Sequence, residues 1–236
     1  MDKLRFDDIL MKNGFAITER EYNLLVEFVR LLLDWNTKIN LVSRKDVENI
    51  WQKHILGSLA ILFNYKFQEQ SSIVDVGTGG GFPGIPLAIC LPECSFLLVD
   101  SIQKKINVVA DIIEKLELKN TTAICGRAEE LNMKAVYNRK YTYVTARAVA
   151  PVSDVVGWTK MFLRTSIAPP DQTQIPGEKR TISSGSIIIF KGGDVTAELE
   201  QARIKQNPKS IETLPLIIEG VELADFTDKK LVVIRP

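Results

Sequence analysis

Hydrophobic residues follow two different patterns along this chain. Up to about residue 63, apolar positions recur every three or four residues, which is the spacing of amphipathic helices. Three helices are predicted there, at residues 4–13, 19–35 and 46–63. They predict an N-terminal helical cap, residues 1–66, packed on a main domain formed by residues 67–236.

From residue 72 onwards, short strand-like apolar runs, the first of them the β-branched stretch 73–76, alternate with amphipathic segments. The runs predict seven strands, at 73–76, 96–99, 121–125, 141–146, 186–190, 211–218 and 230–234. The segments between them predict helices at 84–91, 102–116, 152–163 and 196–205, with Ser101 capping the second. Because strands joined through helices run parallel, the pattern predicts an α/β fold with a doubly wound, mostly parallel seven-stranded sheet. No helix separates the last two strands, so they are expected to close it as an antiparallel hairpin.

One segment, residues 165–185, departs from this alternation. It contains three prolines and little periodicity. A structureless stretch of about twenty residues inside a compact domain is usually functional or disordered. The segment precedes a predicted strand, so it could lie over the edge of a pocket.

The first predicted strand ends in a glycine-rich turn that opens a helix. A strand, a glycine turn and a helix N-terminus together form a nucleotide-type pocket with free backbone N–H groups. The glycines fit two frames. Gly79-x-Gly81-x-x-Gly84 matches the dinucleotide fingerprint, although Pro83 falls inside it. Asp75-x-Gly77-x-Gly79-x-Gly81 instead looks like the first motif of S-adenosylmethionine-dependent methyltransferases.

Polar residues follow the next strands at the same edge of the sheet. Asp100 can accept hydrogen bonds from both hydroxyls of a ribose, or it can cap the following helix. The loop after the third strand carries Glu129, which either reads an adenine edge or supplies helix-start charge. Arg147 and Lys191 end the fourth and fifth strands, where they could hold substrate or serve as ordinary surface charges.

Composition limits the partners and the chemistry. The 236 residues include 30 basic and 29 acidic side chains, so contact with nucleic acid must come from a local patch. No apolar run reaches the roughly 20 residues of a membrane span. Three cysteines and one histidine offer no metal set, and we expect no metal and a reducing, cytoplasmic location. His54 is expected to be a partly buried, hydrogen-bonded structural residue, and the protein a monomer.

The stretch Asp-Val-Gly-Thr-Gly-Gly-Gly-Phe-Pro-Gly-Ile-Pro-Leu, residues 75–87, closely resembles the motif of the bacterial glucose-inhibited division protein B family. Further matches are Trp35-Asn36, Asn40-Leu41, His54-Ile55-Leu56, Leu98-Val99-Asp100-Ser101, residues 127–130, Arg147-Ala148, Lys191-Gly192 and Leu231-Val232-Val233-Ile234. Members of that family are small-subunit ribosomal RNA guanine-N7 methyltransferases. Two features depart from the family: Gly57 replaces its usual Asp, and the segment after Leu163 is longer.

The resemblance implies a Rossmann-like class I methyltransferase with S-adenosylmethionine as methyl donor and N7 of a guanine in 16S ribosomal RNA as acceptor. It implies cofactor contacts from Gly77, Phe82, Ala128, Glu129 and Arg147, to which the glycine frame and strand-end position add Gly79 and Asp100. N7 carries a lone pair and no proton, so it can attack the methyl group directly and in line. Arg147 and Lys191 are the candidates for positioning the substrate, because such side chains can hold guanine O6.

Two other readings of the residues remain at this stage. A nicotinamide-dependent oxidoreductase would need a proton-transfer group near the glycine turn, whereas His54 lies far along the chain in the cap. A non-catalytic RNA-binding protein could keep the cofactor fold, although a net charge of +1 disfavours tight binding to unstructured RNA.

Overall fold

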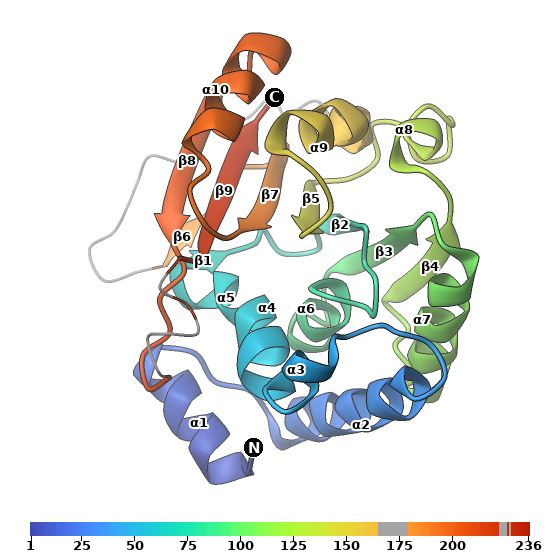
Figure 1. Ribbon diagram of the computed structural model, residues 1–236, viewed down its shortest axis with the longest axis vertical. Coiled ribbons are helices and arrows are strands. Elements are labelled where there is room, and N and C mark those ends of the chain that lie inside the picture. The colour runs from blue at the N-terminus through green and yellow to red at the C-terminus, as the bar shows by residue number, and fades with distance from the viewer. Residues whose placement is uncertain (165–178, 222–225, 227) are drawn as a thin grey trace.

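A computed structural model describes residues 1–164, 179–221, 226 and 228–236. Its centre is a seven-stranded sheet in the order β4-β3-β2-β5-β7-β9-β8 (Figure 1). The strands are β2 Ser72–Val76, β3 Ser95–Asp100, β4 Thr121–Cys125, β5 Tyr143–Arg147, β7 Ser186–Lys191, β8 Ser210–Pro215 and β9 Lys230–Arg235. The first five pair in parallel, while β9 runs antiparallel to both β7 and β8. The predicted mostly parallel sheet and its antiparallel closing pair are therefore confirmed.

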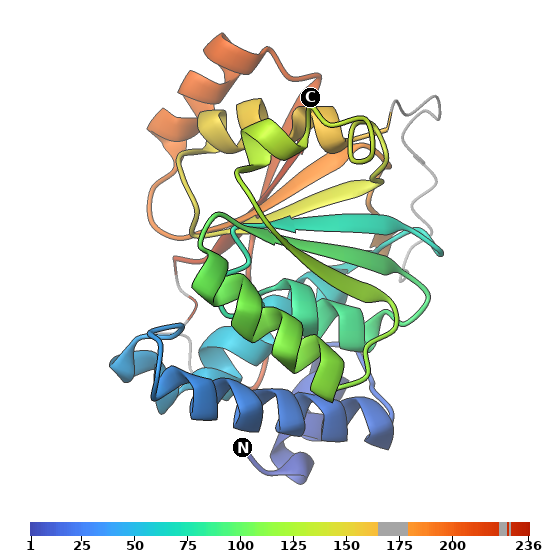
Figure 2. The same cartoon turned by 90° about the vertical axis from the view of Figure 1, so that its right-hand side faces the viewer.

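Helices cover both faces of the sheet (Figure 2). One face carries α6 Gly84–Cys90 and α7 Gln103–Lys115, and the other carries α8 Ala128–Leu131, α9 Val152–Thr159 and α10 Thr196–Gln206. A short 3₁₀ turn, Lys160–Phe162, extends α9. Each face has its own cluster of buried apolar side chains. Within the described parts of the chain, no helix is long and apolar enough to cross a bilayer.

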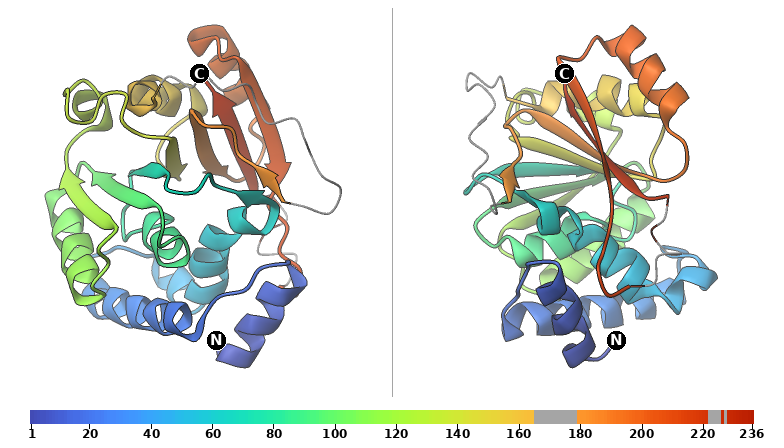
Figure 3. Two further views of the ribbon diagram at one scale, coloured as in Figure 1. Left: turned by 180° about the vertical axis from the view of Figure 1, so that it is seen from behind. Right: turned by 90° about the vertical axis from the view of Figure 1, so that its left-hand side faces the viewer.

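The N-terminal helices lie beneath α6 and α7 as a further layer (Figure 3). They begin with α1 Lys3–Lys12 and α2 Glu19–Asn36, and Thr18 forms a capping box with Glu21 at the start of α2. Their buried residues belong to the same cluster as those of α6 and α7. Trp35 Nε1 also donates to Asp111 Oδ2 on α7 at 2.7 Å. The cap therefore shares a core with the sheet, and the boundary at residue 66 stays a prediction.

The prediction of one continuous helix over residues 46–63 is wrong. The segment divides into α3 Arg44–Val47, the π-helical turn η1 Ile50–Leu56, α4 Gly57–Leu59 and α5 Ile61–Asn64. Side chains donate hydrogen bonds to two backbone carbonyls of the widened turn. Arg147 Nη2 donates to the Lys53 carbonyl, and Ser58 Oγ donates to the His54 carbonyl, each at 2.6 Å. Such turns occur frequently at functional sites.

Two smaller predictions also need correction. Ser101 does not cap α7, because Asp100 Oδ1 accepts the N–H of Ile102 at 2.9 Å instead. The segment 165–185 is not structureless where it is described: β6 Arg180–Thr181 pairs in parallel with β1 Tyr65–Lys66. Residues 165–178 lie outside the described residues, so the prediction for them is untested.

Candidate functional site

A cavity of about 330 Å³ lies at the carboxyl ends of β2, β3 and β4; we call it the strand-end cavity. Its walls include Gly77, Asp100, Ala128, Glu129, Ala148 and Trp158. Open parallel sheets bind ligands at this edge, in the crevice beyond the strand ends. The volume falls within the range of small-molecule sites.

Glycine is required at the floor of this cavity. Gly77 has a φ of +70°, and a Cβ placed on it would lie 2.5 Å from Val149 Cγ2. A side chain at this position would force the loop after β5 away, so the glycine lets that loop close against the end of β2.

Asp75 supports the glycine turn from below. Its carboxylate is fully buried, with Oδ1 accepting from Thr145 Oγ1 at 2.9 Å and Oδ2 accepting the N–H of Gly84 at 3.1 Å. Burial raises the pKa of Asp75 to about 6, and the hydrogen bonds partly oppose that shift. Asp75 therefore holds β2, β5 and the start of α6 together.

Asp100 lies on the wall of the strand-end cavity. Its Oδ2 accepts the N–H of Gly79 at 3.0 Å and its Oδ1 accepts the N–H of Ile102. Each oxygen keeps a further lone pair, because a carboxylate has about four acceptor positions. Asp100 can thus bond a ligand hydroxyl while it fixes the glycine turn. Gly79, which the sequence also proposed as a cofactor contact, is not among the described residues that line this cavity.

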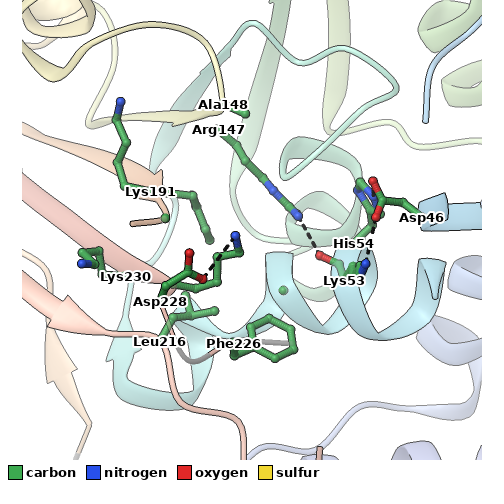
Figure 4. Close-up of a pocket in the computed structure, with 14 residues that line it drawn as sticks. Asp46, Lys53, His54, Arg147, Ala148, Lys191, Leu216, Phe226, Asp228 and Lys230 are labelled. Carbon is green, nitrogen blue, oxygen red and sulfur yellow. Dashed lines mark hydrogen bonds and ion pairs between the residues drawn. The ribbon is translucent and has the colours of Figure 1, made fainter. Parts of the chain in front are cut away.

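A second cavity, of about 500 Å³, lies between the sheet edge and the cap; we call it the cap-side cavity (Figure 4). Five of its described residues are basic and two are acidic: Lys53, Arg147, Lys191, Lys229, Lys230, Asp46 and Asp228. Phe226 and Leu216 add apolar surface. The mixture suits an anionic ligand that carries a flat apolar group.

Arg147 points from the end of β5 toward the cap (Figure 4). Its Nη2 donates to the Lys53 carbonyl, and its Nη1 lies 3.3 Å from Ser58 Oγ. Burial lowers the pKa of Arg147 to about 10, so the guanidinium stays charged at neutral pH. A Cβ on Gly57 would lie 3.7 Å from both Nη atoms, so the residue that departs from the family motif directly neighbours this cation.

His54 and Phe82 pack against each other beside Arg147. Their ring centroids are 4.8 Å apart, and Phe82 also contacts Phe28 at 5.2 Å. His54 is partly buried, as predicted, but the expected hydrogen bond is not seen among the described residues. Its Nδ1 is buried without a partner, and its Nε2 lies 4.0 Å from Asp46 Oδ2. Burial, reinforced by the Arg147 charge, lowers the pKa of His54 to about 4. Phe82 is not among the described residues that line either cavity.

Lys191 points away from Arg147 (Figure 4). Its Nζ donates to Glu198 Oε2 at 2.7 Å and to the Ala150 carbonyl at 2.8 Å. The Lys191 ammonium is therefore already engaged, although its stem lines the cap-side cavity.

The two cavities meet at Ala148, which lines both. Of the predicted site residues, the strand-end cavity gathers Gly77, Asp100, Ala128 and Glu129, while the cap-side cavity takes Arg147 and Lys191. The sequence analysis missed Trp158 of α9, since nothing in its spacing separates a cavity wall from an ordinary core position. Among the described residues, no group of three or more His, Cys, Asp or Glu side chains could hold a metal ion.

Comparison with known proteins decides between the readings left open by the sequence. The family described as GidB, rRNA small subunit methyltransferase G, matches residues 21–167. The chain belongs to this family. The match starts in α2 and continues through β5, so it includes the glycine turn and Arg147. Neither the oxidoreductase nor the non-catalytic reading is favoured by this membership.

Relatives and solved structures agree with the family. A ribosomal RNA small subunit methyltransferase G from Bacteroides thetaiotaomicron is 36% identical over 225 residues, covering 95% of this chain and 98% of that protein. Its counterpart from Christiangramia forsetii is 41% identical over 83% of this chain and 84% of its own length. A SAM-dependent methyltransferase structure from Aquifex aeolicus has a TM-score of 0.50 at 13% identity, covering 81% of this chain and 94% of that one. The fold is thus the Rossmann-like methyltransferase fold.

Proposed function

We propose that this enzyme transfers a methyl group from S-adenosylmethionine to N7 of a guanine in 16S ribosomal RNA. The observation that carries the proposal is the meeting of two cavities at Ala148. A donor in one cavity and an acceptor base in the other would have their reacting ends at this shared wall. Holding two reactants in this way supplies much of the rate enhancement for a direct transfer.

The strand-end cavity fits the methyl donor. Asp100 offers free lone pairs for the ribose hydroxyls, and Ala128 and Glu129 lie at the β4 end, where the base would rest. Gly77 allows close approach of the main chain. When bound, S-adenosylmethionine supplies the electrophilic sulfonium methyl group.

The cap-side cavity fits a guanine with its flanking phosphate. The Arg147 guanidinium and Lys230 provide positive charge, and the Phe226 ring provides apolar surface for a base withdrawn from its stack. Arginine is suited to guanine because O6 accepts hydrogen bonds, and a contact with O6 leaves the N7 lone pair free to attack. Since N7 carries no proton, the enzyme needs no general base, and the low pKa of His54 is compatible with a purely structural role.

The partner on this proposal is 16S ribosomal RNA or the small ribosomal subunit, met in the cytoplasm by a monomeric enzyme. Mapping N7-methylguanine in 16S ribosomal RNA from cells with and without the gene tests the proposal. We expect one guanine to lose its methyl group in the deletion strain, and an unchanged map would reject the proposal.

A binding experiment tests the cofactor separately. Calorimetric titration of the purified protein is expected to give binding heat with S-adenosylmethionine and none with NAD. Heat with NAD alone would return the dinucleotide frame of the glycine turn to consideration.

A further inference from the structure

A third cavity, of about 310 Å³, lies at the opposite edge of the sheet from the strand-end cavity. Arg139 and Gly185 line it just before β5 and β7. Lys209 and Arg235 line it from the start of β8 and the end of β9, which run antiparallel to each other. We call this cavity the amino-edge hollow.

The charged side chains that line the hollow are all of one sign. Five of its lining residues are basic: Arg139, Lys160, Arg164, Lys209 and Arg235. None of the described residues that line it is Asp or Glu. The whole chain carries a net charge of only +1, so this is a local concentration of positive charge.

The cations of the hollow differ from those of the cap-side cavity in their pairing. Three of the five cap-side cations, Lys53, Lys191 and Lys229, each form a salt bridge with a described residue, whereas Arg147 and Lys230 form none. Four of the hollow's cations form no salt bridge with any described residue: Lys160, Arg164, Lys209 and Arg235. Their charge is therefore available to an external anion.

The walls of the hollow are held in place by the backbone. The Arg139 N–H donates to the Met161 carbonyl at 2.7 Å, and the Arg164 N–H donates to the Tyr141 carbonyl at 2.8 Å. The Arg164 side chain is oriented as well, because its Nη2 donates to Ser72 Oγ at 2.8 Å. Cations on a fixed frame lose less entropy on binding than cations on mobile segments.

We propose that the amino-edge hollow binds backbone phosphates of the ribosomal RNA substrate, away from the methylated base. The proposal rests on the proposed function for the identity of the RNA. A chain of this length has a radius of gyration of about 18 Å, so one folded RNA can reach both edges of the sheet. Phosphate contacts of this kind position a nucleic acid without reading its sequence.

The test uses two double variants that remove equal charge. Lys160→Gln with Lys209→Gln removes two of the hollow's five positive charges, and Arg20→Gln with Lys119→Gln removes two exposed positive charges elsewhere. Binding of each protein to transcribed, unmethylated bacterial 16S ribosomal RNA is measured across a salt series. Each phosphate contact makes the logarithm of the association constant fall by about 0.7–0.9 for each unit increase in the logarithm of the salt concentration. The salt slope of the hollow variant should therefore be less steep than that of the wild-type protein by about 1.4–1.8. Its melting temperature and its affinity for S-adenosylmethionine should be unchanged.

Each outcome decides the matter. A slope that matches the control variant overturns the proposal, even if the wild-type protein methylates the RNA. Absence of binding between the wild-type protein and the RNA overturns it too. A reduced slope supports phosphate binding at the hollow, and it does so even if no methylated guanine is found, in which case only the proposed function fails.

Discussion

The backbone N–H of Gly84 donates a hydrogen bond to Asp75 Oδ2 at 3.1 Å, which ties the first turn of α6 to the strand before it. A Cβ at residue 84 would lie 2.8 Å from that same oxygen and 2.3 Å from Leu98 Cδ2. The glycine is therefore needed for packing at a place where its φ is ordinary.

Gly84→Ala is expected to destabilise the protein by about 1–3 kcal/mol through overpacking. For a chain of this size that corresponds to a fall in melting temperature of roughly 2–4 °C per kcal/mol. Gly157→Ala is the control, because its Cβ would meet only the flexible end of Gln206 at 3.1 Å. Equal melting temperatures for the two variants would contradict the prediction.

Asp75→Asn is expected to change how stability depends on pH. The folded state holds the Asp75 proton up to about pH 6, whereas an exposed Asp in the unfolded chain loses it near 3.8. The folded state thus binds more protons between these values, and stability falls by up to about 3 kcal/mol as pH rises through that window. Asparagine cannot ionise, so urea unfolding at several pH values should show a gap between the two proteins that narrows with rising pH. A constant gap would refute the assignment.

Arg147→Ala is expected to lower kcat/KM for ribosomal RNA by about 10- to 100-fold, because it removes charged hydrogen-bond donors from the cap-side cavity. Calorimetry with S-adenosylmethionine then assigns the role. An unchanged Kd makes Arg147 a substrate-positioning residue, and a weakened Kd makes it a cofactor residue. Lys191→Ala gives the matched comparison at the other predicted position, and wild-type kinetics in the arginine variant would remove Arg147 from the site.

Ala148→Leu is expected to lower kcat by at least tenfold, because it places a larger side chain where the two cavities meet. Ala148 has a φ of +54°, so Ala148→Gly relieves backbone strain and leaves the junction open. The glycine variant should therefore keep wild-type kcat. Wild-type kcat in the leucine variant would show that the junction is not where transfer occurs.

Gly57→Asp is expected to be tolerated and to keep methylation activity. The new carboxylate would lie beside the Arg147 guanidinium, and its Cβ would meet Phe226 Cε1 at an ordinary 3.5 Å. Gly57→Ala separates the effect of losing a glycine from the effect of the added charge. It removes up to about 1 kcal/mol of the entropy cost of ordering glycine and adds no charge. A melting temperature for the aspartate variant below that of the alanine variant would argue against a favourable pair with Arg147.

The sheet was predictable because most of its strands are short apolar runs between turn residues, and β2 and β4 match their predicted ranges to within one residue. The strand predicted at 211–218 is less regular and ends earlier, at Pro215. The gathering of Asp100 and Glu129 at one cavity was predictable for the same reason, since parallel strands place their carboxyl ends at one edge. Family resemblance, rather than pattern, supplied the acceptor.

Other features depend on contacts that a local pattern does not contain. The π-helical turn η1 forms where Arg147, nearly a hundred residues later, bonds the Lys53 carbonyl. The strands β1 and β6 are two residues each and lie far apart in sequence, so neither has a pattern of its own. The direction of Lys191 follows from Glu198, whose position beside it requires α10 to be in place.

The order of strands has a consequence for synthesis of the chain. β9 follows β7 and β8 in the chain, yet it lies between them in the sheet. Until it emerges, β7 exposes the row of backbone groups that later bonds residues 231–234, and β8 has no partner. A nascent chain therefore carries an open sheet edge that can pair with other chains until β9 is translated.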